Sequence, residues 1–238
     1  MRRFWQEVRV VSRDAGTGLE LDGRPLRTPA GQPLVVPSVA LATTIAAEWR
    51  VQEETVDPVT MPATRLASTV VDRLPALRTA AIDELVGIVR TDLVLYRADR
   101  PDDLVLRQEE AWQPILSWLC ARYDVDLGVT RWLVPVDQPA ASIRRLRAVV
   151  ERLDDWRLVG LHAAAQPLGS LALGLALAER VVSADEAADR SLLDELYEIE
   201  TWGWEVEVDR RHRALRADVE AAARFLMALD DPDEAVAG

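Results

Sequence analysis

Lysine is missing from this sequence, so all 28 of its basic side chains are arginines. They are outnumbered by 40 acidic side chains, which leaves a formal net charge of −12. A surface of that sign repels phosphate backbones and anionic lipid headgroups, and we therefore expect no nucleic-acid partner. The acid excess is suited instead to a partner with a basic or polar face.

Cysteine and long apolar runs are also scarce. Cys120 is the only cysteine, so no disulfide can form within the chain, and a reducing, cytoplasmic location is expected. The longest apolar window, residues 168–177, covers about ten residues where a membrane span needs about twenty, so we expect no membrane insertion. The arginines at positions 2 and 3 precede no apolar run, and we expect neither a secretory signal nor a transit peptide.

The patterns that carry catalysis are absent as well. Glycines are few and scattered, without a phosphate loop or a dinucleotide-binding fingerprint. Ser170 lacks the glycines of a nucleophile elbow and is interpreted as a small residue at a tight helix crossing. Cys120 lies on an amphipathic pattern, as a small buried hydrophobe does. We therefore expect a protein that is not an enzyme and that takes no cofactor and no small-molecule substrate.

Periodicity divides the chain into a β-rich beginning and a helical remainder. Short β-rich runs separated by turn residues fill residues 5–36, with Asp22-Gly23 as the tightest turn, which predicts an antiparallel meander. Helical spacing starts after Ser38 and dominates from Pro62 onward. The predicted fold class is α+β, a small antiparallel β-rich N-terminal domain followed by a larger all-helical C-terminal domain. The predicted limits are residues 1–95, residues 96–230 and a disordered acidic tail at 231–238.

An acidic segment, Ser191–Asp209, stands out within the helical part. A capping box at Ser183 and Glu186 is expected to start its helix. At about 100° per residue, one apolar stripe contains Leu192, Leu196, Ile199, Gly203 and Val206, and beside it lie Glu195, Glu198, Trp202, Glu205 and Asp209. Carboxylates at the edge of a buried stripe are partly desolvated and cost free energy unless a group, internal or external, pairs with them. A tryptophan among acids is typical of a partly exposed interaction residue.

Metal binding is the alternative explanation of these acids. Glu195, Glu198 and Glu205 could ligate a metal in a carboxylate-ligated hydrolase, but no histidine follows a glutamate by three residues, as dinuclear carboxylate sites usually require. The two histidines are isolated: His162 is expected at the edge of the core and His212, inside RRHR, in solvent. We expect no metal site. A third interpretation is that the acidic helix docks the two domains.

Several separated strings together resemble a known family. They are RFWQEV, LDGRPLRTPAGQPLVVPS, AAEWRVQEETVDPVTMPATRLASTVVDR, RTDLVLYRA, the GSL segment and LLDELYEIETWGWEVE, in that order over nearly the whole chain. The family is the assembly chaperone of the alpha subunit of F-type ATP synthase, and the likeness is to a bacterial member. The resemblance implies a two-domain fold, binding of the free alpha subunit before it meets beta, and no catalysis.

The resemblance also implies site residues. The family's acidic site on the helix before the W-G pair matches Asp194 and Glu195, and its tryptophan in the E-W-x-x-Q string matches Trp49. Glu198 stands where many relatives have glutamine, and Leu168 where serine is common. The expected protein is a monomer when free that shields the beta-facing surface of alpha. Its predicted partner-binding residues are Glu195, Asp194, Glu198, Trp202, Glu205 and Trp49.

Overall fold

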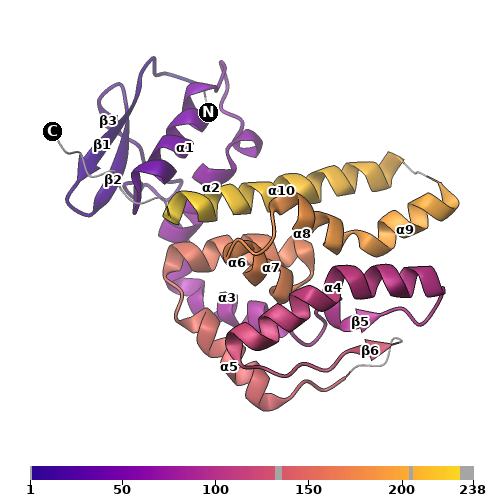
Figure 1. Ribbon diagram of the computed structural model, residues 1–238. Helices are drawn as coiled ribbons and strands as arrows, with labels where there is room; N and C mark the ends of the chain where they lie inside the picture. Colours follow the sequence, from indigo (N-terminus) through magenta and orange to yellow (C-terminus); the bar gives the residue numbers. More distant parts are fainter. Residues whose placement is uncertain (1, 132–135, 204–205, 231–238) are drawn as a thin grey trace. The chain divides into compact units, whose positions relative to one another are not determined.

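The computed structural model describes residues 2–131, 136–203 and 206–230 (Figure 1). It divides into two compact units, each built from segments far apart in the sequence. The first unit comprises Met1–Arg78, Asp155–Gly160 and Arg224–Gly238, and the second comprises Thr79–Asp154 and Leu161–Ala223. Three of the four boundaries between the units fall inside helices, so these helices contribute residues to both units.

The first unit contains the predicted meander. Strands β1 (Val8–Arg13) and β2 (Gly16–Leu21) pair antiparallel from Val8↔Leu21 to Arg13↔Gly16, and β3 (Arg24–Pro25) and β4 (Val35–Val36) both pair with β2. Asp22 and Gly23 have φ of 48° and 76°, the positive values that a tight hairpin turn needs at both central positions. The antiparallel meander and its Asp22-Gly23 turn are confirmed.

Helices α1 (Val39–Arg50) and α2 (Pro62–Asp72) complete this part of the unit, with the 3-10 turn η1 (Pro58–Thr60) between them. Ser38 caps α1 by accepting from the amide of Leu41 at 3.1 Å, and the helix face that carries Leu41, Ile45 and Trp49 is buried. The Glu48 carboxylate accepts from the amides of Ala63 and Thr64 at 2.7 and 2.8 Å, which supplies the first turn of α2 with a side-chain cap.

Helices make up most of the second unit. In chain order the remaining helices are α3 (Leu74–Ile88), α4 (Asp102–Tyr123), α5 (Ala140–Glu151), α6 (Asp155–Leu168), α7 (Leu171–Ala178), α8 (Ala184–Ser191), α9 (Leu193–Trp202) and α10 (Val206–Asp230). A 3-10 turn, η2 (Leu93–Leu95), leads into β5 (Tyr96–Arg97), which pairs parallel with β6 (Thr130–Arg131). Strand β6 is only two residues long, and residues 132–135 lie outside the described part of the chain.

The small residues around Ser170 allow two helices to cross closely, as predicted. Ser170 caps α7 by accepting from the amide of Leu173 at 3.0 Å. A Cβ added to Gly174 would lie 2.8 Å from the Cβ of Ala165 in α6, so the backbones of α6 and α7 approach as only glycine allows.

Asp92 joins η2 to the start of α7. Its buried carboxylate accepts from the amide of Ala172 at 3.1 Å and from that of Val94 at 3.3 Å. Burial raises the pKa of the Asp92 carboxyl from 3.8 to about 6, although hydrogen bonds from Ser170 and nearby amides favour the charged form. This carboxylate therefore satisfies buried backbone donors at a cost in desolvation.

The α+β fold class is confirmed. The predicted domain limits of 1–95 and 96–230 stay a prediction, and the predicted acidic tail at 231–238 lies outside the described residues. Within the described part of the chain, no helix combines the length and the apolar character needed to cross a bilayer.

Candidate functional site

The acidic segment is not one continuous helix, which corrects the predicted stripe. The capping box of Ser183 and Glu186 is present and starts α8, but α8 ends at Ser191 and α9 begins at Leu193. Gly203, with φ of 99°, then ends α9. Left-handed backbone at a glycine is a common helix terminator, so the stripe predicted to reach Val206 stops at Trp202. Glu205 lies outside the described residues.

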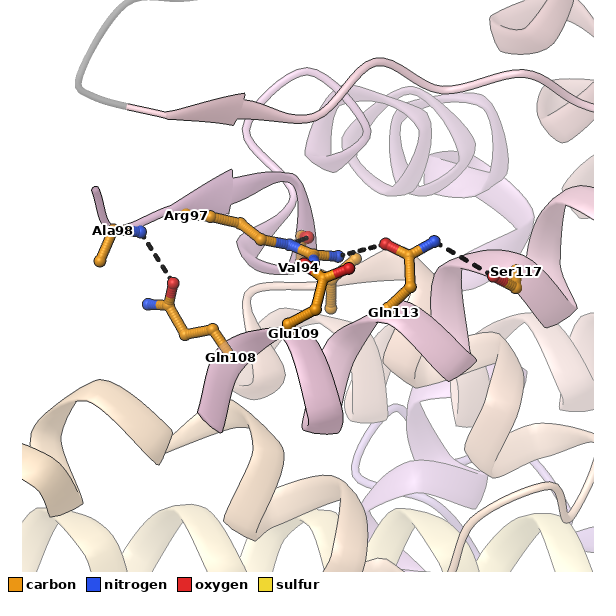
Figure 2. A network of polar contacts seen from close by, with 7 residues as sticks. All are labelled: Val94, Arg97, Ala98, Gln108, Glu109, Gln113 and Ser117. Carbon is orange, nitrogen blue, oxygen red and sulfur yellow. Dashed lines mark hydrogen bonds and ion pairs between the residues drawn. The ribbon is translucent and has the colours of Figure 1, made fainter. Parts of the chain in front are cut away.

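A network of polar contacts holds α4, the helix that packs beside α9 (Figure 2). The Arg97 side chain is buried, donating to Glu109 at 2.6 Å and to the side chain of Gln113 at 3.1 Å. Burial lowers the pKa of Arg97, although the Glu109 charge favours its protonated form. The residue before Glu109 on α4 is Gln108, whose side-chain oxygen accepts from the amide of Ala98 at 2.7 Å. This hydrogen bond fixes the orientation of the Gln108 side-chain amide.

Gln108 holds the first acid of α9. Its amide nitrogen donates to Asp194 Oδ1 at 2.6 Å, and Gln108 is only 1% exposed. Burial raises the pKa of Asp194, the charges of Glu198 and Glu195 raise it further, and the Gln108 hydrogen bond opposes them. Asp194 is therefore held from inside the protein through one of its two oxygens, Oδ1, and lies close to two other negative charges.

Glu195 pairs with α10 rather than with α4. His212 Nε2 lies 2.6 Å from Glu195 Oε2, and Arg211 Nη2 forms an ion pair with the same oxygen. Burial alone would raise the pKa of Glu195, but the hydrogen bonds from His212 and Arg211 outweigh it, and the pKa lies below its ordinary value. The prediction that His212 is solvated is wrong, since this residue is 4% exposed. The neighbouring arginines suggested an exposed position, but the His212 side chain points inward to the Glu195 carboxylate.

Glu198 and Trp202 form the exposed end of the acidic face. At about 100° per residue, Glu195, Glu198 and Trp202 lie within about 60° of one another around α9. Trp202 is 85% exposed, as expected for an interaction residue. The Glu198 carboxylate is exposed and makes no hydrogen bond or ion pair with any described residue. We call Glu195, Glu198 and Trp202 the α9 face.

Contacts from another side of α9 keep the α9 face in place. The Tyr197 hydroxyl donates to the Asp103 carboxylate at 2.9 Å, and the Arg107 guanidinium lies 5.3 Å from the centre of the Tyr197 ring. Arg107 also forms an ion pair with Glu200 at 2.7 Å. Sequence reasoning missed these partners from α4 because each lies about 90 positions from the residue it contacts, with no local pattern to link them.

Trp49, the remaining predicted binding residue, belongs to the first compact unit. It is 7% exposed, and its ring centre lies 5.0 Å from that of Trp5. Neither indole nitrogen of this pair has a hydrogen-bond partner among the described residues. Its surroundings are those of a core residue, whereas Asp194 and the α9 face belong to the second unit.

Asp194, Glu195 and Glu200 of α9 are each paired with side chains of the protein itself. Among the described residues, no group of three or more His, Cys, Asp or Glu is placed to hold a metal ion. Of the three glutamates in the metal alternative, Glu195 is bound by His212 and Arg211, and Glu205 is not described. His162, expected at the core edge, is half-buried and lies 2.8 Å from Glu84.

Comparisons with known proteins agree with the resemblance seen in the sequence strings. The profile of a family described as ATP12 chaperone protein matches residues 2–120. The crystal structure of Atp12 from Paracoccus denitrificans is 36% identical, with a TM-score of 0.92 over 96% of this chain and 98% of that one. The Atu1473 protein from Agrobacterium tumefaciens is 35% identical, with a TM-score of 0.90 over 96% of this chain and 86% of that one.

A more distant relative extends the comparison to a eukaryote. The mitochondrial protein atp12 of Schizosaccharomyces pombe is 23% identical over 214 residues, which cover 85% of this chain and 74% of that protein. The family profile covers half of the chain, and the solved relatives cover nearly all of it at more than a third identity. This chain therefore belongs to the ATP12 family of F1-ATPase assembly chaperones.

Proposed function

We propose that this chaperone binds the free alpha subunit of F-type ATP synthase and shields the surface that beta later covers, without catalysing a reaction. Membership of the ATP12 family supports the general role. The observation that carries the proposed contact is the α9 face, where Glu198 and Trp202 are exposed beside a half-exposed Glu195.

Electrostatics favours a basic group of the partner on this face. Burial is the main cause of the raised pKa of Asp194, and the negative charges of Glu198 and Glu195 raise it further, as expected for neighbouring acids that repel one another. A partner's cation would relieve that repulsion and pair with the unpaired Glu198. Because the protein carries a net charge of −12, a basic surface would also be attracted at long range.

Trp202 adds an apolar anchor to the charged contact. A flat, exposed indole next to carboxylates can cover apolar surface of the partner or stack on a guanidinium. Interaction hot spots are commonly built from such an aromatic surrounded by polar groups. A contact of this size is modest, which suits a chaperone that must release alpha when beta arrives.

Charge reversal at Glu198 tests the proposal. Glu195→Lys is a poor choice because it would place a cation against Arg211 and the buried His212, and so would disturb the fold. Glu198→Lys touches no internal pair. We expect it to fold normally and to protect monomeric alpha from aggregation far less than the parent protein, as followed by light scattering.

The matched control is Glu110→Lys, which reverses an exposed acid on α4 that has no hydrogen bond or ion pair with a described residue. It changes the net charge equally, so it should retain full protection. If Glu198→Lys and Glu110→Lys protect alpha equally well, the α9 face is not the contact. If the parent itself fails to bind alpha, the proposed partner is wrong.

The remaining expectations are proposals of the same standing. We propose that the free protein is a monomer and works in the cytoplasm. We propose that Trp49 contributes to binding through the fold of the first unit, because its indole is buried against Trp5. The metal-hydrolase alternative gains no support from the partners that the described acids have.

A further inference from the structure

The Glu195 carboxylate is held through only one of its two oxygens. Both His212 Nε2 and Arg211 Nη2 contact Oε2. No described residue donates a hydrogen bond to Oε1, and the Glu195 side chain is 40% exposed. A carboxylate has about four acceptor positions on its two oxygens, so this group retains capacity for another donor.

The two residues that hold Oε2 differ in burial. The His212 side chain is 5% exposed, so the residues packed around it fix its position. Arg211 precedes it on the same helix and its side chain is 63% exposed, so it pairs with Glu195 from the solvent side. A buried hydrogen bond fixes orientation, whereas an exposed ion pair contributes little and exchanges readily.

We propose that His212 is the positioning residue of the α9 face: it fixes Oε2 of Glu195 so that Oε1 receives a basic side chain of the bound partner. Arg211 is the internal cation with which that side chain competes. This inference rests on the proposed function, because it names how the same face recognises its partner. Glu198, one helical turn from Glu195, offers the second carboxylate to the incoming cation.

Substitutions of His212 and Arg211, both on α10, should have opposite effects on the affinity for the partner. Loss of the His212 hydrogen bond frees the Glu195 side chain to rotate. Binding must then order that side chain, and the lost conformational entropy weakens the affinity for the partner. Loss of Arg211 leaves the orientation unchanged but removes a neutralising charge, so the partner's cation meets a stronger attraction. A merely structural role for both residues would predict no gain in affinity from either change.

The experiment measures the Kd of purified monomeric alpha subunit for variants of the full chain at low and at high salt. His212→Leu removes the donor, and His212→Gln replaces it because the Gln amide nitrogen takes the place of Nε2. Arg211→Ala removes the competing cation. Arg213→Ala is its matched control: Arg213 lies on the same helix, is similarly exposed and pairs at 2.6 Å with Asp209 instead. Glu195→Gln removes the charge itself.

We expect His212→Leu to weaken binding roughly tenfold and His212→Gln to restore it to within about threefold of the parent, since tenfold corresponds to loss of one oriented polar contact. Arg211→Ala should tighten binding by about threefold to tenfold at low salt, with the gain lost at high salt. Arg213→Ala should leave the Kd unchanged. Glu195→Gln should weaken binding at least tenfold and flatten the salt dependence.

The outcomes separate the inference from the proposed function. If the parent does not bind alpha, the proposed function fails. If the parent binds and Glu195→Gln weakens binding, but His212→Leu and His212→Gln have equal Kd values, the positioning role is overturned. If His212→Leu does not fold, the variant of the exposed Arg211 provides the test. A Kd for Arg211→Ala that equals or exceeds the Kd for Arg213→Ala overturns the inference.

Discussion

The crossing of α6 and α7 gives the sharpest prediction about the fold. Replacing Gly174 by alanine would put a methyl group 2.8 Å from the Cβ of Ala165, 3.1 Å from its Cα and 3.3 Å from its amide nitrogen. Two of these three atoms are backbone, so no rotamer change can make room. Such overpacking costs about 1–3 kcal/mol.

A second glycine supplies the comparison. Gly87 lies near the end of α3, and a Cβ added there would meet no atom within 4 Å. Alanine favours a helix over glycine by up to about 1 kcal/mol at either site, so this gain cancels when the two variants are compared. Gly174→Ala should therefore be less stable than Gly87→Ala by about 1–3 kcal/mol, the overpacking cost alone.

Thermal unfolding followed by circular dichroism measures this difference. For a chain of this size, 1 kcal/mol corresponds to about 2–4 °C in Tm, so Gly174→Ala should melt roughly 2–12 °C below Gly87→Ala. Urea unfolding of the same two variants at one fixed temperature gives the difference in unfolding free energy without heating. Equal Tm values for the two variants would refute the close approach of α6 and α7.

Three further changes test other parts of the account. Asp92→Asn tests the buried carboxyl. Between pH 3.8 and about 6 the raised pKa keeps Asp92 protonated only in the folded state, so this group costs the parent about 2–3 kcal/mol of unfolding free energy as pH rises. The variant lacks that contribution, so the difference in stability between parent and variant should depend on pH. A pH-independent difference in urea titrations would contradict the buried carboxylate. Ser183→Ala should lose about 1 kcal/mol of stability with its capping box, and an unchanged urea midpoint would argue against the cap. Trp202→Ala should leave Tm unchanged, because the side chain is 85% exposed, and should weaken alpha binding about tenfold; equal affinity in a titration would exclude Trp202 from the contact.

Local signals allowed much of the fold to be predicted from the sequence. The Asp22-Gly23 turn, the Ser38 cap and the Ser183 capping box each depend on residues within four positions of one another, and all three are present. The close crossing of α6 and α7 was also indicated in the sequence by the small residue Ser170. These features depend on interactions between residues close in the sequence, and for them the sequence pattern and the structure agree.

The candidate site was only partly predictable for the same reason. His212 was expected in solvent because its immediate neighbours are arginines, yet Glu195, 17 positions earlier, accepts its hydrogen bond in the interior. Gln108 lies 86 positions from the Asp194 that it holds. The extent of the acidic helix was overestimated because Gly203 fits a helical stripe in a wheel projection but adopts a positive φ in the chain.

These differences change the meaning of the acidic segment. Wheel geometry indicated that its carboxylates need partners, and the structure supplies internal partners for Asp194 and Glu195. Glu198, one oxygen of Glu195 and one oxygen of Asp194 receive no hydrogen bond from a described residue and keep acceptor capacity. The surface offered to a partner is therefore narrower than the segment, and its orientation depends on α10.

The central claim is that this chaperone holds the alpha subunit only until beta replaces it. Size-exclusion chromatography with light scattering, on the purified chaperone mixed with monomeric alpha before and after addition of beta, tests that claim most directly. The account predicts a complex of one chaperone and one alpha that disappears as alpha–beta assemblies form, with free chaperone released. A complex that persists when beta is added, or no complex in its absence, would contradict the account.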